Sequence, residues 1–425
     1  MIYILEGADG AGKSSVFQWL KEHLEDAVFI KESYTPSLEE RKQRVGKFER
    51  LLQSGKTVVY DRATILDDYI YEPIMANVES QLDASVTWPL LKQATVIYFD
   101  CPVKVLAERL AQRGDDYIEE HHLQSIVDAY EKMFTSIEPY RVDATCSLNA
   151  LCIQIEKIIK KKEFKIAHIV PVGSLAATSS NGYHMCLANV VVKNGKYKEF
   201  YRQMAKDRFV LMDNGAAEGD QLHVDDLIKC YQDVQPSEVV LPDTLCNGVD
   251  TIQKSKLALK EICDFYDGAV PFTFMAVPQG STFDQWLACA EEMVQWPEVH
   301  TIGVSKFLQM ELNAEYIRYS ACMELDRLFK KYNRGDMEVH LLGCSESPRV
   351  IEDIRKSFPF VRGCDSAYAY ICTQANVPIF HTTERPEGEI DFINGATYKG
   401  LNDNMQALEL AVGVYDNKMT KIWSK

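Results

Sequence analysis

The sequence contains no apolar run approaching the ~18 residues that a membrane-spanning helix requires. It also has no secretory leader, because the opening residues MIYILEGADG have the pattern of a short strand and a turn. Both absences argue against a membrane protein and against export. We therefore expect a cytoplasmic protein with no membrane partner.

Positive charge and closely spaced cysteines are also scarce. The 46 basic residues are outnumbered by 62 acidic ones, which gives a net charge of -16 and argues against a broad grip on a phosphate backbone. The densest basic run, given by Arg41, Lys42, Arg44, Lys47 and Arg50, has helical spacing and fits either a solvated helix face or a phosphate contact. Twelve cysteines at irregular spacings are typical of reduced thiols rather than of a disulfide framework.

The length of 425 residues predicts two or three domains. A lysine-rich stretch from Lys157 to Lys165 ends one helical run, and a new strand, AHIVPV, follows it. We place the boundary there, with one domain at residues 1–162 and a second at 166–425. In the first domain the runs IYILEG, TVVYDR and TVIYFD alternate with helical patterns, which is typical of βαβ units in an α/β fold with a parallel sheet.

The second domain continues this alternation. Seven strand-like runs, each followed by a helix-like stretch, are AHIVPV, FVLMDNG, EVVLPD, FTFMAVPQ, TIGVSK, EVHLLG and VRGCDS. An eighth strand is expected in VPIFH, Val377 to His381. The length of this segment is close to the ~250 residues of a (β/α)8 barrel, which is the preferred prediction. A second open α/β sheet is the alternative.

A phosphate-binding motif lies near the start of the chain. Residues 7–14, GADGAGKS, fit G-x-x-x-x-G-K-[ST] and stand between a predicted strand and a predicted helix, as the motif requires. Backbone N–H groups of such a loop surround phosphate oxygens, Lys13 neutralises the terminal phosphates, and Ser14 is a ligand for Mg²⁺. The sequence thus predicts ATP and Mg²⁺ binding by Gly7, Asp9, Gly10, Gly12, Lys13, Ser14 and Ser15.

The first domain resembles thymidylate kinases and related deoxynucleotide kinases. The resemblance is carried by YILEGADGAGKSS and by TVVYDRATILDDYIY, which is similar to the Asp-Arg motif of these enzymes. It implies that Asp61 lies near Mg²⁺, that Arg62 holds the acceptor phosphate, and that Asp9 contacts the acceptor sugar. Gly10 stands where some thymidylate kinases have an arginine, so the lid-like stretch CPVKVLAERLAQRGDD would supply it. Arg109 and Arg113 would then stabilise the transferring phosphoryl group, unless both are solvated helix surface.

Several predicted barrel strands end in an acid, an amide or a glycine. The C-terminal ends of the strands form the face on which such barrels have their active sites. These residues are Asp213, Asp243, Gln279, Gly280, Gly303 and Asp365. Each of the acids taken singly also fits a helix cap or an ordinary loop carboxylate. Gln279 could also have a structural role, as a hydrogen-bonding side chain at the barrel mouth that binds no ligand.

Taken in order, the motifs DNGAA, PD, VPQG, IGVS and GCDSA resemble those of tRNA-guanine transglycosylases and of their DNA-modifying relatives that insert 7-deazaguanines. The resemblance implies that Asp365 is a nucleophile toward C1′ of the sugar and that Asp213 is the general acid and base. Asp243, Gln279, Gly280 and Gly303 would bind the purine or 7-deazapurine base. The family's Cys-x-Cys-x-x-Cys zinc cluster is missing, so we expect no zinc and expect Cys344, Cys364 and Cys372 to be buried thiols.

These observations favour a bifunctional enzyme of nucleotide or DNA modification, in which a deoxynucleotide kinase is fused to a base-exchange barrel. A viral origin, hence a host cytoplasm, would fit such a fusion, and the resemblance makes a homodimer plausible. The barrel would act on a free deoxynucleotide or on DNA, where the base would have to be flipped out. Two alternatives stay open: a kinase with a non-catalytic, base-binding barrel, and a kinase that acts on a modified base already in DNA.

Overall fold

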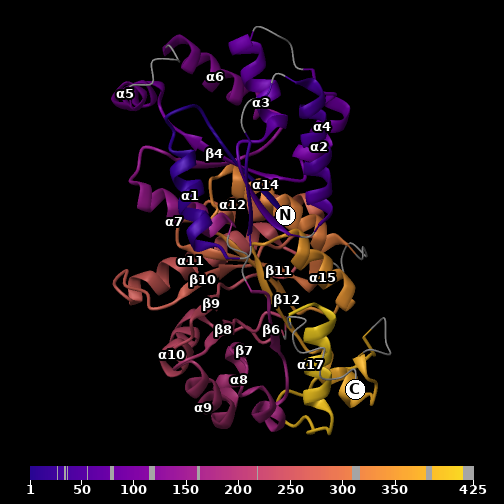
Figure 1. Ribbon diagram of the computed structural model, residues 1–425. Helices are drawn as coiled ribbons and strands as arrows, with labels where there is room; N and C mark the ends of the chain where they lie inside the picture. Colours follow the sequence, from indigo (N-terminus) through magenta and orange to yellow (C-terminus); the bar gives the residue numbers. More distant parts are fainter. Residues whose placement is uncertain are drawn as a thin grey trace. The chain divides into compact units, whose positions relative to one another are not determined.

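The computed structural model describes residues 1–25, 27–32, 35, 37–54, 56–76, 81–113, 120–159, 163–217, 219–308, 316–379 and 385–414. The chain divides into two compact units, Met1–Lys160 with Phe329–Asp336, and Lys161–Leu328 with Met337–Lys425. Each unit contains one parallel sheet with helices around it (Figure 1). Among the described residues, no helix is both long enough and apolar enough to cross a membrane.

The sheet of the first unit has five parallel strands in the order β2-β3-β1-β4-β5. The strands are β1 (Ile2–Glu6), β2 (Ala27–Lys31), β3 (Thr57–Asp61), β4 (Thr95–Asp100) and β5 (Tyr140–Asp143). The three predicted strands form the centre of the sheet, where apolar residues are buried on both faces. The two that the sequence analysis did not single out, β2 and β5, are the edges, whose residues are less completely buried.

Seven helices and one π-helical turn surround this sheet in the described residues. They are α1 (Lys13–His23), α2 (Leu38–Gln53), α3 (Thr64–Tyr71), η1 (Glu72–Ala76), α4 (Ala84–Leu91), α5 (Val103–Arg113), α6 (Glu120–Met133) and α7 (Leu148–Ile159). In α1 the buried side chains Val16, Phe17 and Leu20 recur at helical spacing and pack into the core of the unit. Because all strands are parallel, the loops after β1 and β3 meet at one edge of the sheet.

The second unit contains eight parallel strands in the order β6-β13-β12-β11-β10-β9-β8-β7. They are β6 (Lys165–His168), β7 (Tyr183–Leu187), β8 (Phe209–Asp213), β9 (Glu238–Val240), β10 (Thr273–Ala276), β11 (Val299–Ser305), β12 (Glu338–Leu342) and β13 (Val361–Ser366). The strands at the two ends of this order, β6 and β7, follow one another in the chain and lie side by side. The sheet is therefore a nearly closed barrel, consistent with the predicted (β/α)8 fold and not with an open sheet.

The eighth strand was predicted in the wrong place. Residues 377–379 form no strand, and residues 380–381 lie outside the described residues. The strand that the sequence did not reveal is β7. Its sequence YHMCL contains no β-branched residue, and because all five residues are buried it does not alternate between apolar and polar side chains. Its place is fixed by pairing with β8 rather than by local preference.

Helices cover the outside of the barrel. The helical elements are η2 (Val172–Thr178), α8 (Ala188–Lys193), α9 (Gly195–Met204), α10 (Val224–Val234), α11 (Gly248–Phe265), α12 (Phe283–Val294), α14 (Ile317–Lys331), α15 (Pro348–Ser357), α16 (Tyr368–Gln374) and α17 (Leu401–Ala411). Inside the barrel, side chains such as Met185, Leu211 and Met275 pack together. All twelve cysteines lie in described segments and no disulfide joins them; Cys344, Cys364 and Cys372 are buried, as predicted.

Candidate functional site

The predicted phosphate-binding loop connects β1 to α1 in the first unit. Gly7, Gly10 and Gly12 have φ values of 143°, 86° and 95°, which side-chain-bearing residues rarely adopt. Gly12 directly precedes α1, so the loop leads to the N-terminal end of this helix, where backbone N–H groups are available to an anion. The motif therefore has the strand, turn and helix context that the sequence predicts.

Lys13 lies folded onto this loop. Its Nζ donates hydrogen bonds to the carbonyl oxygens of Gly7, at 2.6 Å, and Ala8, at 2.8 Å. Burial, and then the nearby Arg62, lower the pKa of Lys13 to about 8. A bound phosphate would offer this ammonium group a stronger partner than two neutral carbonyls.

Ser14 and Asp61 come together at the end of β3. The Ser14 hydroxyl donates to Oδ2 of Asp61 at 2.9 Å, and Nζ of Lys31 lies 2.9 Å from the same oxygen. A hydroxyl beside a carboxylate is an oxygen donor set that suits Mg²⁺, which binds proteins through few ligands and keeps water or phosphate oxygens for the rest. The residues predicted to hold the metal thus fit it chemically.

Arg62 lies against the phosphate-binding loop and occupies the left-handed region, with φ 63°. Its Nη2 lies 2.5 Å from Oδ1 of Asp9, and its guanidinium group stands over the ring of Tyr71, 4.6 Å from the centroid. A residue other than glycine in this conformation carries backbone strain, which is retained where surrounding structure demands it and often at functional sites. The two residues that the resemblance assigns to the acceptor therefore form one ion pair.

These residues line a cavity of about 640 Å³ in the first unit. Its walls are formed by Asp9, Gly10, Gly12, Lys13, Ser14, Ser15, Lys31, Glu32, Asp61, Arg62, Asp67, Tyr71, Glu72 and Arg113. Most of the predicted nucleotide-binding set is included, whereas Gly7 and Arg109 are not among these lining residues. A cavity of this size is within the range of small-molecule sites.

The sequence analysis missed several acids of this cavity, above all Asp67. The Oδ1 atom of Asp67 is buried and accepts no hydrogen bond from any described residue. Burial, and then the charge of Glu6, raise the pKa of Asp67 to about 7. Asp67 and Tyr71 are four residues apart on α3, so their shared helix face was a readable signal.

Glu32 also belongs to the cavity and accepts two hydrogen bonds from Thr64, from the backbone N at 2.9 Å and from the hydroxyl at 2.7 Å. It follows β2, the edge strand that the sequence did not reveal. Glu6, which is fully buried behind the loop, accepts from the backbone N of Ala63 at 3.1 Å and from the hydroxyl of Tyr130 at 2.7 Å. These contacts fix the segment around Arg62.

The two arginines predicted to act together, Arg109 and Arg113, make different contacts. Arg109 donates to the carbonyl oxygens of Gly10, at 3.3 Å, and Ala144, at 2.9 Å, so it braces the phosphate-binding loop from behind. Arg113, at the end of α5, lines the cavity itself. The stretch that would continue the lid, residues 114–119, lies outside the described residues.

The basic run on α2 divides in two. Arg41 is buried and pairs with Asp68, at 2.7 Å, and Glu72, at 3.2 Å, while Arg44 pairs with Glu40. The remaining members, Lys42, Lys47 and Arg50, are exposed. Arg41 therefore supports the cavity wall through Glu72, and the exposed lysines fit the solvated face.

In the barrel unit, one predicted cluster forms beyond the ends of β8, β9 and β10. Oδ1 of Asp243 accepts from the Asn214 amide at 3.0 Å, and Oδ2 accepts from the Gln279 amide at 2.7 Å. Burial raises the pKa of Asp243, and these two hydrogen bonds oppose the rise. Asp213 ends β8, and its Oδ2 accepts from the backbone N of Gly215 at 3.0 Å.

The two predicted glycines occupy different places. A Cβ at Gly280 would lie 2.4 Å from the backbone N of Trp286, so this position allows the loop after β10 to touch α12. Gly303 lies within β11, where a Cβ would meet Leu342, Met275 and Val277. Glycine at 303 leaves room for these barrel side chains.

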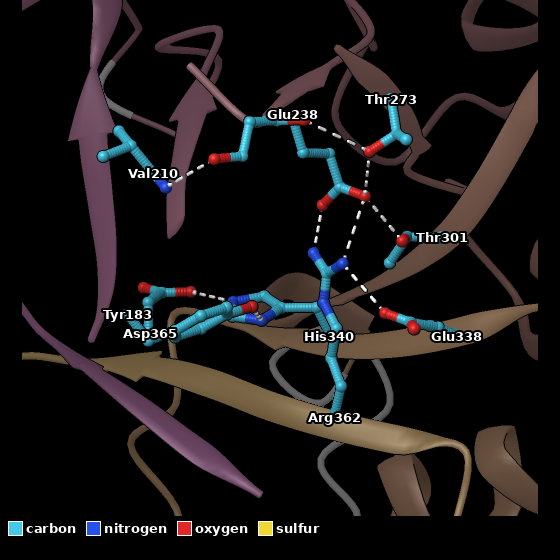
Figure 2. Close-up of polar contacts among 10 residues, drawn as sticks. Tyr183, Val210, Glu238, Thr273, Thr301, Glu338, His340, Arg362 and Asp365 are labelled. Carbon is cyan, nitrogen blue, oxygen red and sulfur yellow. Dashed lines mark hydrogen bonds and ion pairs between the residues drawn. The ribbon is translucent and has the colours of Figure 1, made fainter. Parts of the chain in front are cut away.

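Asp365 lies within β13 beside the fully buried His340 of β12 (Figure 2). Within the described residues, the hydrogen bonds to its side chain come from the His340 ring, at 3.2 Å, and from the backbone N of Gly343, at 2.9 Å, and both end on Oδ1. The Asp365 side chain is buried, with 8% of it exposed, and no hydrogen bond from a described residue ends on Oδ2. The carboxylate is thus held through one oxygen, and the other has no partner among the described residues.

Comparison with known proteins finds similarity in the first part of the chain, and no family model matches. A probable thymidylate kinase from Saccharolobus solfataricus is 25% identical over 185 residues, which cover 38% of this chain and 97% of the relative. Among solved structures, a deoxyadenosine kinase from M. mycoides with dCMP and dCDP is similar at 18% identity and a TM-score of 0.29, covering 38% of this chain and 99% of that one. The YorR protein of Bacillus subtilis in complex with phosphorylated GDP is similar at 23% identity and a TM-score of 0.32, covering 38% and 96%. The N-terminal unit is therefore similar to nucleotide kinases.

Proposed function

We propose that residues 1–162 form an ATP- and Mg²⁺-dependent kinase for a deoxynucleoside monophosphate. The observation that carries this proposal is the cavity in which a complete phosphate-binding loop faces Asp61 and Arg62. Similarity to a probable thymidylate kinase supports a monophosphate acceptor. The mixture of carboxylates and cations on the walls suits a ligand with both phosphate and hydrogen-bonding groups.

In this proposal the residues that line the cavity have different roles in phosphoryl transfer. The loop and Lys13 hold the donor phosphates, and Lys13 exchanges its two loop carbonyls for phosphate oxygens. Arg62 leaves Asp9 in part to pair with the acceptor phosphate, while Arg113 faces the transferring group from α5. Mg²⁺, held with Ser14 and Asp61, supplies neutralisation of the phosphate charge. Asp67 offers its unpartnered oxygen to a hydrogen-bond donor of the acceptor nucleoside.

The test is a panel of the deoxynucleosides and their monophosphates incubated with ATP and Mg²⁺, with product diphosphates separated by chromatography. One monophosphate should be phosphorylated far faster than the others. Phosphorylation of nucleosides but of no monophosphate would contradict the acceptor assignment. Phosphorylation of a DNA oligonucleotide instead would favour a kinase that acts on a modified base in the polymer.

We propose for residues 166–425 a second activity, the exchange of guanine for a 7-deazaguanine on a deoxynucleotide or in DNA, without zinc. The specific observation in favour is the state of the carboxylates near the barrel mouth. Asp243 has both oxygens occupied by amides, as a base-binding acid would before a base replaces them, whereas one oxygen of Asp365 accepts no hydrogen bond from a described residue. That difference suits Asp365 as nucleophile, Asp213 as general acid and base, and Asp243 with Gln279 as base contacts.

In this proposal Oδ2 of Asp365 forms a bond to C1′ while the bond from C1′ to the base nitrogen breaks, and Asp213 protonates the departing base. The incoming base then reverses these steps. Incubation with labelled guanine and either dGMP or guanine-containing DNA should put label into one of them. Without an acceptor base, peptide mass spectrometry should find a sugar adduct on Asp365. Label in neither acceptor, with base still bound by the barrel, would favour a binding module.

A further inference from the structure

A line of polar side chains crosses the barrel interior and ends on Asp365 (Figure 2). The Tyr183 hydroxyl, at the start of β7, lies 2.8 Å from Nδ1 of His340, and Nε2 of His340 lies 3.2 Å from Oδ1 of Asp365. The guanidinium group of Arg362 lies near the Tyr183 ring, 5.8 Å from its centroid, and is paired with Glu238 and, at 3.0 Å, with Glu338. The barrel-mouth chemistry proposed above uses only the last member of this line.

The donors and acceptors that these side chains carry determine the direction of the hydrogen bonds between them. A carboxylate has only acceptors, so the His340 ring donates from Nε2 to Oδ1 of Asp365. In a neutral ring Nδ1 is then the acceptor, and the Tyr183 hydroxyl donates its proton to it. Burial lowers the pKa of His340, which favours the neutral ring, and a neutral ring that accepts at Nδ1 carries its proton on Nε2. That proton points at Asp365.

We propose that His340 is a positioning residue for Asp365, held as the Nε2–H tautomer by Tyr183. This inference rests on the proposed base exchange in the barrel. The Nε2–H group and the backbone N of Gly343 both donate to Oδ1, so they fix the plane of the carboxylate. Oδ2 is left to attack C1′.

The same hydrogen bond has a use in both halves of the exchange. When Oδ2 becomes bonded to C1′, Oδ1 becomes the carbonyl oxygen of a glycosyl ester and still accepts from His340. When the incoming base displaces the ester, the bond from C1′ to Oδ2 breaks and its electron pair returns to the carboxylate. The donor stabilises that charge, and no proton has to leave His340 in either step.

The test compares His340→Phe, which removes the donor, with His340→Gln, whose side-chain amide places a donor near the former Nε2. A matched control is His184→Phe, because His184 is also buried in a barrel strand but bonds the Asn181 carbonyl oxygen and packs against Phe200 and Tyr201. Each full-length variant is assayed with labelled guanine and whichever of dGMP or DNA the unmodified protein labels.

His340→Phe should lower kcat for exchange about 10- to 100-fold, the range seen when partners that orient a reactive ligand are removed, with KM nearly unchanged. His340→Gln should restore most of the rate, and His184→Phe should keep the rate of the unmodified protein. A purely structural role would not give a loss of kcat at nearly constant KM that the conservative variant restores.

A wild-type rate in His340→Phe, or equal losses in His340→Phe and His184→Phe, would overturn the positioning role while leaving base exchange intact. Absence of exchange in the unmodified protein would instead remove the proposed activity and this inference with it. Tyr183→Phe and NMR of ¹⁵N-labelled histidine give an independent measurement that needs no activity. The unmodified protein should show His340 neutral with its proton on Nε2, and a proton on Nδ1 would overturn the assignment.

Discussion

The buried pair between Arg362 and Glu238 gives a quantitative prediction about the barrel. Glu238 is fully buried and accepts two hydrogen bonds from Arg362, one from Thr301 at 2.7 Å and one from Thr273 at 3.2 Å (Figure 2). In Glu238→Ala the guanidinium group keeps only Glu338, which is partly exposed. Breaking a buried pair in this way costs about 3–5 kcal/mol, because the remaining charge stays desolvated.

For a domain of this size, that loss lowers the melting temperature by about 10 °C, at roughly 2–4 °C for each kcal/mol. Differential scanning calorimetry of the full chain measures it, with kinase activity after refolding as the control for the first unit. The double variant Glu238→Leu with Arg362→Met leaves no unpaired buried charge there and should recover at least half of the loss. A Glu238→Ala cost below about 1 kcal/mol, or a double variant worse than the sum of its two single variants, would refute this reasoning.

Three further predictions concern other parts of the chain. Because the pKa of Asp67 is raised to about 7 in the folded state, its contribution to stability is lost as pH rises from about 4 through 7. The stability of Asp67→Asn relative to wild type should therefore rise by about 2–3 kcal/mol between pH 5 and pH 8 in urea unfolding, and a constant difference would count against the raised pKa. Arg109→Ala should raise KM for ATP several-fold with a modest effect on kcat, because Arg109 supports the phosphate-binding loop through the Gly10 carbonyl. Arg113→Ala should lower kcat at least about 100-fold, because Arg113 lines the cavity. Steady-state assays with ATP measure both effects, and the reverse pattern would exchange the two roles. Gly280→Ala should destabilise the barrel by about 1–3 kcal/mol in the same unfolding experiment, because its Cβ would lie 2.4 Å from a backbone atom of α12, and a neutral effect would mean that the loop can move away.

The central architecture could be predicted from the sequence because its signals are local. The phosphate-binding loop shows its glycines, Lys13 and Ser14 in one segment, and the buried strands β1, β3 and β4 are continuous apolar runs. The barrel was visible in its repeated strand and helix pattern. What failed was the strand β7, since YHMCL carries no local preference and is defined only by its neighbours.

Most of the site acids that were missed depend on contacts distant in sequence. Asp67 is an example, because burial and the charge of Glu6, which is 61 residues away in the sequence, raise its pKa. His340 looked like part of an ordinary apolar strand, EVHLLG, until pairing of β12 with β13 brought it to Asp365. In the same way, Arg109 and Arg113 lie four residues apart on one helix, and only their contacts in the structure distinguish the roles we assign to them.

The most direct test of the account is a crossed assay of two variants of the full chain, Lys13→Ala and Asp365→Asn, each measured for nucleotide phosphorylation and for base exchange. Lys13→Ala should abolish phosphorylation of the preferred deoxynucleotide and leave exchange of labelled guanine at the wild-type rate. Asp365→Asn should do the opposite, lowering exchange by orders of magnitude with phosphorylation intact. Phosphorylation at the wild-type rate in Lys13→Ala, or exchange at the wild-type rate in Asp365→Asn, would contradict the assignment of that activity to its site.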